Sequence, residues 1–242
     1  MNINRFTEEE QMQAKFLMTK NVKKFVTLVN NLINRAEGVP GMALVYGEPG
    51  LGKSKVALWW SANNDGILIT AKKTMSPHWL LEEIVKEVGE TPLYKSSDLF
   101  DQVVKALIKY PRVIIVDEVD YLVSDKEAVE ILRDIHDRTH NPIVLIGMSF
   151  ADKKLKRYTH LYDRFSEILH FETFTANDID TFLNELSEVK FTPEAINYIH
   201  QTGNRFRQIV KLINKAEEIA ATNDLKEINK ETVMKITRKD LI

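Results

Sequence analysis

The stretch that most constrains the fold runs from Met42 to Lys55, with the sequence MALVYGEPGLGKSK. Its apolar beginning is typical of a buried strand, and the segment that starts at Lys53 is typical of a helix. Between them, glycines allow backbone N–H groups to point inward around an anion, and the helix directs its positive dipole end at the same anion. The spacing G-x-x-x-x-G-K-S between a strand and a helix predicts a phosphate-binding loop.

The residues of this loop have different roles in holding a triphosphate. We expect the Lys53 ammonium to neutralise the β- and γ-phosphates and the Ser54 hydroxyl to ligate Mg²⁺. Backbone N–H groups supply the remaining contacts. The predicted nucleotide-binding residues are Gly47, Glu48, Pro49, Gly50, Leu51, Gly52, Lys53, Ser54 and Lys55.

An acidic pair follows the β-branched run at residues 113–116. Asp117 and Glu118 end this run, in the arrangement known as Walker B. An aspartate at the carboxyl end of such a strand holds Mg²⁺, directly or through water, and the next glutamate orients and polarises the attacking water. We therefore predict Asp117 as a metal ligand and Glu118 as a catalytic residue, and we assign Asp120 to the surface or to a helix cap.

The alternation of strands and helices predicts a parallel α/β sheet flanked by helices. Short apolar runs predict further strands at residues 67–70, 143–147 and 168–171. After residue 171 only helical patterns follow, so we expect an all-α lid without strands. The expected organisation is a helical extension over 1–37, a P-loop core over 38–172 and a helical lid over 173–242.

Three polar positions complete the predicted site, each with an alternative. Ser149 follows the fourth strand and either contacts the γ-phosphate or caps the next helix. Arg164 precedes the last core strand, where oligomeric ATPases place an arginine finger for a neighbour's nucleotide; Arg157 is its rival, and a surface ion pair is the other possible role. In the lid, Arg207 is the candidate for contact with the phosphates, and Arg205 is its rival.

Composition narrows the class of protein. The formal net charge of −2 gives no whole-molecule attraction to nucleic acid or acidic membranes, so any such contact must be local. The absence of cysteine excludes disulfides, cysteine-ligated zinc and thiol catalysis. No apolar run is long enough to cross a membrane, and the first residues lack a signal-peptide core, so we expect a soluble cytoplasmic protein.

Together these motifs resemble the AAA+ ATPases over nearly the whole chain. Three further stretches, MSPHWLL at 75–81, ILRDIHD at 131–137 and IGM at 146–148, are similar to the transposase-helper ATPases of the MuB, TniB and TnsC family. The resemblance implies ATP and Mg²⁺ as cofactors, a sheet order of 5-1-4-3-2, and self-assembly into a helical filament or ring on duplex DNA. It also implies that the assembly marks target DNA and recruits a transposase, whose contact stimulates hydrolysis.

The phage Mu member of that family carries an additional N-terminal helix-turn-helix domain, whereas here about forty residues precede the first strand. We therefore expect non-specific contact with DNA phosphates to come from local lysines. Lys72, Lys73 and Lys95 lie in loops that suit this role. Ordinary solvated loops are the alternative for each of them.

Two other functions share this set of motifs. A loader or adaptor ATPase that remodels a protein partner would use the same nucleotide site. A monomeric nucleotide kinase is disfavoured, because the acidic pair and the late helical lid suit attack by water better than transfer to a bound acceptor.

Overall fold

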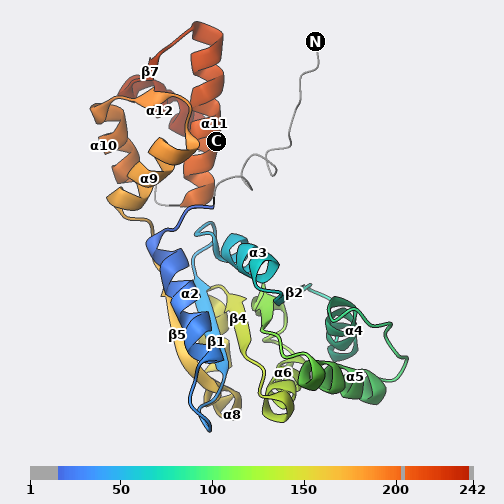
Figure 1. The fold of residues 1–242 in the computed structure, drawn as a ribbon. Coiled ribbons are helices and arrows are strands. Elements are labelled where there is room, and N and C mark those ends of the chain that lie inside the picture. The colour runs from blue at the N-terminus through green and yellow to red at the C-terminus, as the bar shows by residue number, and fades with distance from the viewer. Residues whose placement is uncertain (1–15, 203–204, 240–242) are drawn as a thin grey trace. The chain divides into compact units, whose positions relative to one another are not determined.

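The computed structural model describes residues 16–202 and 205–239 (Figure 1). The described residues form two compact units. The larger unit comprises residues 23–48 and 53–171, and the smaller one comprises residues 16–22, 49–52, 172–202 and 205–239. The first part of the predicted N-terminal extension, residues 1–15, lies outside the described residues.

A five-stranded parallel sheet forms the centre of the larger unit. Its strands lie in the order β2-β3-β4-β1-β5, which confirms the predicted order. Because every pair is parallel, all five carboxyl ends lie at one edge of the sheet. The strands are β1 Met42–Gly47, β2 Ile67–Thr70, β3 Ile114–Asp117, β4 Ile143–Gly147 and β5 Phe165–Phe171.

The start of β5 differs from the prediction. The strand begins at Phe165 rather than at residue 168. It is an edge strand, and its side chains alternate between more and less exposed positions along most of its length. The continuous apolar run that indicates a buried strand therefore covers only its end.

Helices cover both faces of the sheet. Alternate strand residues, including Met42 and Leu44, form one apolar core with residues of α4 to α8. The intervening side chains, such as Ala43 and Val45, are equally buried but point to the opposite face, which α2 and α3 cover (Figure 1). The helices are α2 Lys20–Ile33, α3 Lys53–Asn63, α4 Pro77–Glu87, α5 Ser96–Lys109, the 3₁₀ helix η1 Val119–Tyr121, α6 Lys126–Thr139, α7 Ser149–Leu155 and α8 Thr159–Tyr162.

Side-chain caps fix where two of these helices begin. The Ser76 hydroxyl accepts a hydrogen bond from the Trp79 N–H at 3.2 Å, and Pro77 occupies the first turn of α4. The Asp125 carboxylate accepts a hydrogen bond from the Glu127 N–H at 3.0 Å at the start of α6. Each cap satisfies a helix N–H group that has no partner inside its helix and contributes about 1 kcal/mol.

The smaller unit is mostly helical. It contains α9 Ala176–Leu186, α10 Pro193–Thr202, α11 Phe206–Asn223 and α12 Lys230–Lys239. The expectation that no strands follow residue 171 was wrong, because β6 Lys190–Phe191 and β7 Glu227–Ile228 pair in parallel. Two-residue strands are too short to show an alternating pattern in a sequence.

An aromatic cluster lies among the helices of this unit. The Phe206 ring contacts the Phe182 ring at 5.2 Å between centroids, and Phe174 contacts Phe182 at 4.9 Å. Such edge-to-face contacts pack the beginning of α11 against α9. None of the helices that the structure describes is both long and apolar enough to cross a membrane.

A buried histidine joins the beginnings of two central strands. The His136 Nε2 atom accepts a hydrogen bond from the Gly41 N–H at 3.1 Å, ahead of β1, and its Nδ1–H donates to the Asn141 carbonyl at 2.8 Å, ahead of β4. This pattern requires the neutral ring. Burial lowers the pKa of His136, and the nearby Arg35 charge lowers it further, although the bond to Asn141 opposes the shift. The folded protein therefore holds this histidine neutral.

We expect the pKa of His136 to appear as a pH-dependent loss of stability. In the unfolded chain His136 takes up a proton near the ordinary histidine pKa of about 6.5, whereas in the folded chain its pKa is lower. The free energy of unfolding is therefore highest above that pH and falls as the pH is lowered. Thermal unfolding between about pH 7.5 and about pH 5.5 measures this effect. His136→Gln should show a shallower pH dependence, and an unchanged slope would contradict the assignment.

Candidate nucleotide-binding site

Three neighbouring strands bring the predicted motifs to one edge of the sheet. The glycine-rich loop follows the carboxyl end of β1, Asp117 ends β3, and Ser149 follows β4, which lies between these two strands. The parallel register aligns Val45 with Ile146 and Val116 with Leu145, so the three strands end together. Segments up to about one hundred residues apart in the sequence therefore meet where an open parallel sheet binds its ligand.

The glycine-rich loop has the backbone geometry of an anion cradle. Gly50 and Gly52 have φ angles of 82° and 90°, in the left-handed region where side chains other than glycine are strained. The Lys53 ammonium donates hydrogen bonds to the carbonyls of Gly47 at 2.8 Å and Glu48 at 2.9 Å. The lysine at the start of α3 thus lies against the loop that precedes it.

The charge of Lys53 connects the loop to the acidic pair. Burial lowers the pKa of Lys53, and the carboxylates of Asp117, Asp120 and Glu48 oppose this shift. Lys53 begins α3 after β1, and Asp117 ends β3, so both lie at the carboxyl edge of the sheet. Lys53 and Asp117, which the sequence predicts to act together, therefore belong to one electrostatic site.

The acidic pair has an unusual backbone at its second residue. Asp117 is 6% exposed, and its carboxylate accepts a hydrogen bond from the Glu118 N–H at 2.8 Å. Glu118 is exposed and adopts φ 53° and ψ 37°, a left-handed conformation that costs an L-residue about 1–2 kcal/mol. Strain of this kind collects at functional sites because it places a side chain where relaxed backbone would not.

The side chains at this edge fit a Mg²⁺–triphosphate. Lys53, Ser54 and Asp117 supply a cation, a hydroxyl and a carboxylate, which match phosphate oxygens and a hard metal ion. No cluster of three or more His, Asp or Glu residues in the described chain forms a metal site by itself. A Mg²⁺ ion bound through one carboxylate and the substrate's phosphates suits such a set.

Ser149 does not cap the helix that follows it. It is the first residue of α7, and Met148 occupies the cap position without a side-chain hydrogen bond. The alternative role that the sequence left open for Ser149, as the cap of a helix beginning at Ala151, was therefore wrong. Its location after β4, between the glycine-rich loop and Asp117, suits a contact with the γ-phosphate, which stays a prediction.

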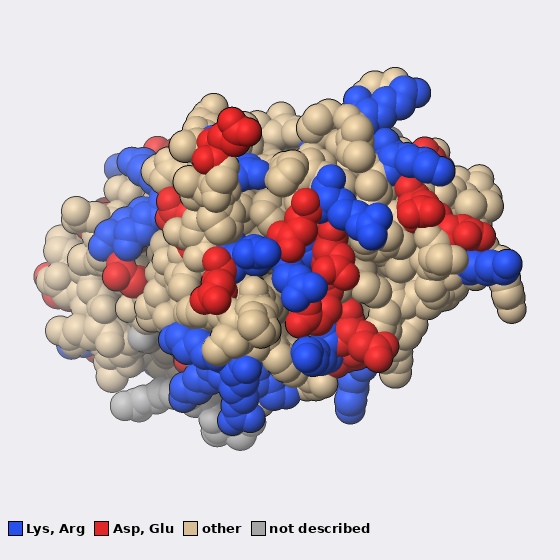
Figure 2. Space-filling view, turned by 90° about the horizontal axis from the view of Figure 1, so that it is seen from below, with Lys and Arg blue, Asp and Glu red and all other residues tan. Residues whose placement is uncertain are grey.

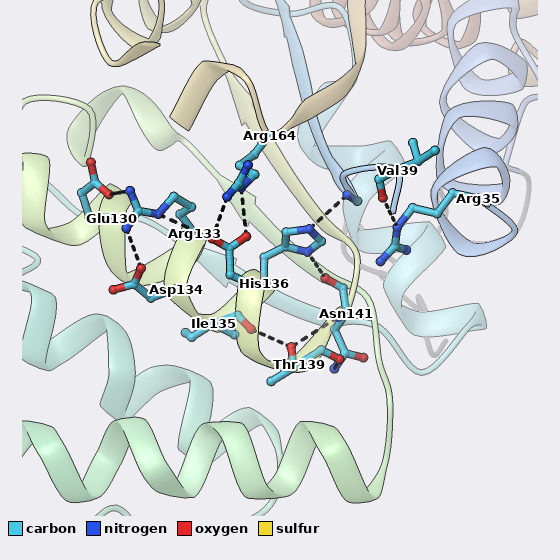
Figure 3. A network of polar contacts seen from close by, with 12 residues as sticks. Arg35, Val39, Glu130, Arg133, Asp134, Ile135, His136, Thr139, Asn141 and Arg164 are labelled. Carbon is cyan, nitrogen blue, oxygen red and sulfur yellow. Dashed lines mark hydrogen bonds and ion pairs between the residues drawn. The ribbon is translucent and has the colours of Figure 1, made fainter. Parts of the chain in front are cut away.

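Arg164 lies at the other edge of the sheet, immediately before β5. Its carbonyl accepts a hydrogen bond from the Met42 N–H at 3.2 Å, beside the start of β1. Its guanidinium donates two hydrogen bonds to Asp137 of α6, at 3.0 Å and 3.2 Å (Figure 3). The structure therefore does not bring Arg164 to the predicted nucleotide-binding residues of the same chain. The rival, Arg157, is exposed in the turn between α7 and α8.

The ion pair of Arg164 belongs to a network of ion pairs along α6. Asp137 also lies 3.9 Å from the Arg133 Nε atom, and Arg133 pairs with Glu130 and with Asp134 (Figure 3). Acidic and basic side chains are likewise interspersed over the middle of the face in Figure 2. The side chains of Arg164 and Asp137 are 41% and 36% exposed, so their pair contributes at most about 1 kcal/mol.

A cavity of about 640 Å³ opens beside Arg164 at this edge. It is lined by the segment from Arg35 to Pro40 and by His136, Asp137 and His140. The Arg35 guanidinium holds that segment in place, because it donates to the carbonyls of Leu32 at 2.6 Å and Val39 at 3.1 Å. His136 and Asp137 belong to the stretch 131–137 that carries the family resemblance, whereas Arg35 and His140 were not singled out by the motif analysis.

The two candidate lid arginines flank the start of α11 in the smaller unit. Arg205 precedes the helix, and Arg207 is exposed in its first turn. The preceding Gly203 and Asn204 lie outside the described residues. The choice between the two arginines stays a prediction.

The three candidate DNA-contact lysines lie around the beginnings of α4 and α5. Lys72 and Lys73 follow β2, and the Lys72 ammonium lies 5.0 Å from the centre of the Trp79 ring. Lys95 precedes α5, whose first residue, Ser96, is hydrogen-bonded to His78 in α4 at 2.9 Å. This contact brings the loop before α4 and the loop before α5 to the same region. All three lysines are exposed.

Comparison with known proteins found one matching family model and several similar proteins. Residues 36–155 match the model of a family described as AAA domain. A potential ATP-binding protein of Staphylococcus aureus is 26% identical over 259 residues, covering 90% of this chain and 93% of that protein. The RuvB subunit of the Holliday junction branch migration complex of Lactobacillus helveticus is 25% identical over 228 residues, covering 86% of this chain and 61% of RuvB.

A solved structure extends the likeness to the fold. The Aeropyrum pernix ORC1 protein in complex with DNA matches with a TM-score of 0.61 at 16% identity, covering 92% of this chain and 66% of that one. The chain thus spans less than two thirds of the length of RuvB and of ORC1. At this identity the match concerns the arrangement of helices and strands alone.

The left-handed backbone at Glu118 gives a stability prediction. Asparagine accepts this conformation more readily than glutamine, so Glu118→Asn should be more stable than Glu118→Gln by about 0.5–1 kcal/mol in urea unfolding. The same pair of substitutions at the exposed helical residue Glu218 is the control, where glutamine should be the more stable because of its helix propensity. The same order at both positions would contradict the strained backbone.

Proposed function

We propose that this chain, which carries an AAA domain on an α/β AAA+ fold, is a Mg²⁺-dependent ATPase that assembles on duplex DNA without sequence preference and recruits or stimulates a transposase. One observation carries the proposal. Lys53, Asp117 and Glu118 lie at one edge of the sheet, whereas Arg164, the cation suited to complete such a site, lies at the other edge, paired with Asp137.

Each residue at the nucleotide edge has a distinct task. Lys53 attracts the β- and γ-phosphates, and the backbone N–H groups of the glycine-rich loop bind their oxygens. Ser54 and Asp117 are the candidate ligands of Mg²⁺, which when bound supplies charge neutralisation at the phosphate oxygens. Glu118, held outward by its left-handed backbone, accepts a hydrogen bond from the attacking water and orients it toward the γ-phosphate.

The opposite position of Arg164 supports self-assembly. An arginine that stabilises the developing charge on a transferred phosphoryl group must reach that group directly. Arg164 can do so only for a neighbouring copy, whose nucleotide edge would face this chain's Arg164 edge. Its weak, solvent-exposed pair with Asp137 allows it to change partners when the neighbour docks.

Contact with DNA is supported by the lysine loops and by the relatives. Lys72, Lys73 and Lys95 surround the beginnings of two helices, and stacking several copies along a duplex would repeat this small positive group. The names of the matched proteins include a Holliday junction branch migration subunit and a DNA complex of ORC1. The transposase partner rests on the motif resemblance to the MuB, TniB and TnsC family.

The size of the protein in solution tests the proposed assembly. Light scattering should detect large assemblies only with both duplex DNA and a slowly hydrolysed ATP analogue, because nucleotide joins the copies and DNA aligns them. Lys53→Ala should stay small under the same conditions, because it lacks the charge that holds the phosphates. A single subunit on DNA in the presence of the analogue would contradict the proposal. A closed ring without DNA would instead favour the loader or adaptor function.

A mixing experiment tests the role of Arg164. Arg164→Ala alone should lose ATP hydrolysis by about 10³-fold, because each site lacks the cation of its neighbour. Lys53→Ala alone should also be inactive, but a mixture of the two variants should regain activity, since one supplies Arg164 and the other an intact loop. Arg157→Ala is the matched control. If Arg164 is the residue that acts on the neighbour's nucleotide, Arg157→Ala alone should keep its ATP hydrolysis. Wild-type hydrolysis by Arg164→Ala alone would remove this residue from the site.

A further inference from the structure

Asp120 connects two parts of the nucleotide edge. It lies in η1, two residues after Glu118, and its Oδ2 atom accepts a hydrogen bond from the Met148 N–H at 2.7 Å. Met148 separates the end of β4 at Gly147 from the start of α7 at Ser149. One carboxylate oxygen therefore joins the turn after Glu118 to the residue that precedes Ser149. From the sequence alone, Asp120 was assigned only to the surface or to a helix cap.

The contact between these two segments is close. A Cβ atom added to Gly147 would lie 2.8 Å from the Asp120 Oδ2 atom and 3.0 Å from the Val119 Cγ1 atom. It would also lie 2.8 Å from the Ala151 Cβ atom. Real Cβ atoms essentially never approach other heavy atoms to less than 3.0 Å, so a side chain at the end of β4 would force η1 or α7 to shift. The close contact leaves η1 little freedom to shift relative to β4.

The turn that Asp120 holds includes the strained residue. The Glu118 carbonyl accepts a hydrogen bond from the Tyr121 N–H at 3.1 Å, which closes the turn around Asp120. Left-handed backbone at Glu118 persists only where the surroundings fix it on both sides. Before Glu118, the Asp117 carboxylate accepts a hydrogen bond from the Glu118 N–H. After Glu118, the hydrogen bond between Asp120 and the Met148 N–H anchors η1.

We propose that Asp120 is a positioning residue, which acts through η1 on Glu118 and through Met148 on Ser149. It sets the separation between the residue that orients water and the residue expected at the γ-phosphate. This inference rests on the proposed ATPase function. The role needs an acceptor for the Met148 N–H, which an asparagine oxygen also supplies and an alanine does not.

The test compares Asp120→Ala with Asp120→Asn and with Asp125→Ala. Asp125 is a matched control, because it also accepts backbone N–H bonds at the start of a helix but lies at α6 rather than in the turn with Glu118. We expect Asp120→Ala to lower kcat by about 10–100-fold, since small misplacements of reacting groups have effects of this size. Its affinity for a fluorescent ATP analogue should change by less than about threefold, because Lys53 and the loop remain.

Rescue separates positioning from general destabilisation. Asp120→Asn should keep kcat within about threefold of wild type, and Asp125→Ala should lower the melting temperature without lowering kcat. Hydrogen exchange gives a readout independent of hydrolysis: the Met148 amide should be protected in wild type and in Asp120→Asn, and should lose protection in Asp120→Ala. If Asp120→Ala does not fold, Gly147→Ala tests the same contact from the other side and should lower kcat with nucleotide binding retained.

Two results would overturn the inference. One is wild-type kcat in Asp120→Ala or, if that variant does not fold, in Gly147→Ala. The other is a Met148 amide that exchanges equally fast in wild type and in Asp120→Ala. A wild-type protein that binds ATP without hydrolysing it, while its Met148 amide stays protected, would instead overturn the proposed ATPase function on which the positioning role depends.

Discussion

The parallel pairing of β1 on both of its sides is the constraint on which the rest of the site depends. β1 pairs with β4 from Met42 to Tyr46 and with β5 from Met42 to Gly47, and the side chains from Met42 to Val45 are fully buried. Parallel pairing gives every strand the same direction, so the loops that follow the strands gather at one edge. The glycine-rich loop, Asp117 and Ser149 meet there for this reason.

The same constraint separates Arg164 from these residues. Arg164 precedes its strand, whereas Asp117 ends one, so the sheet keeps them at opposite edges of a single chain. In the proposed function, a nucleotide bound at one edge and a cation offered at the other would give each copy two complementary faces. Such a head-to-tail contact generates a ring or a filament when it repeats. In the proposed function, the bound nucleotide therefore controls both the chemistry and the assembly.

The sequence predicted the fold through signals that depend on short stretches. Buried strands appear as continuous apolar runs, and the glycine-rich loop fixes the order strand, turn and helix around Lys53. The two-residue strands β6 and β7 carry no such signal. Only the second half of β5 carries it, because along this edge strand exposed residues alternate with less exposed ones. The sheet order that the structure confirms was predicted from the family resemblance, because no local sequence pattern contains it.

The sequence could name the candidate site residues whose predicted role depends on their own side-chain chemistry. Lys53, Asp117 and Glu118 could be named from their types and spacing, and the structure brings them to one edge. Asp120 and Asp137 could not, because their roles depend on which backbone N–H or guanidinium lies opposite them in space. The left-handed backbone at Glu118 could not be predicted either, because glutamate is not a residue type that indicates this conformation.

The central claim is that a site at one edge is completed by an arginine from a neighbouring copy. The rate of ATP hydrolysis per subunit, measured against protein concentration in the presence of duplex DNA, tests it most directly. The account predicts a rate per subunit that is low in dilute protein and rises to a plateau as copies meet. A rate per subunit that stays constant from dilute to concentrated protein would contradict it.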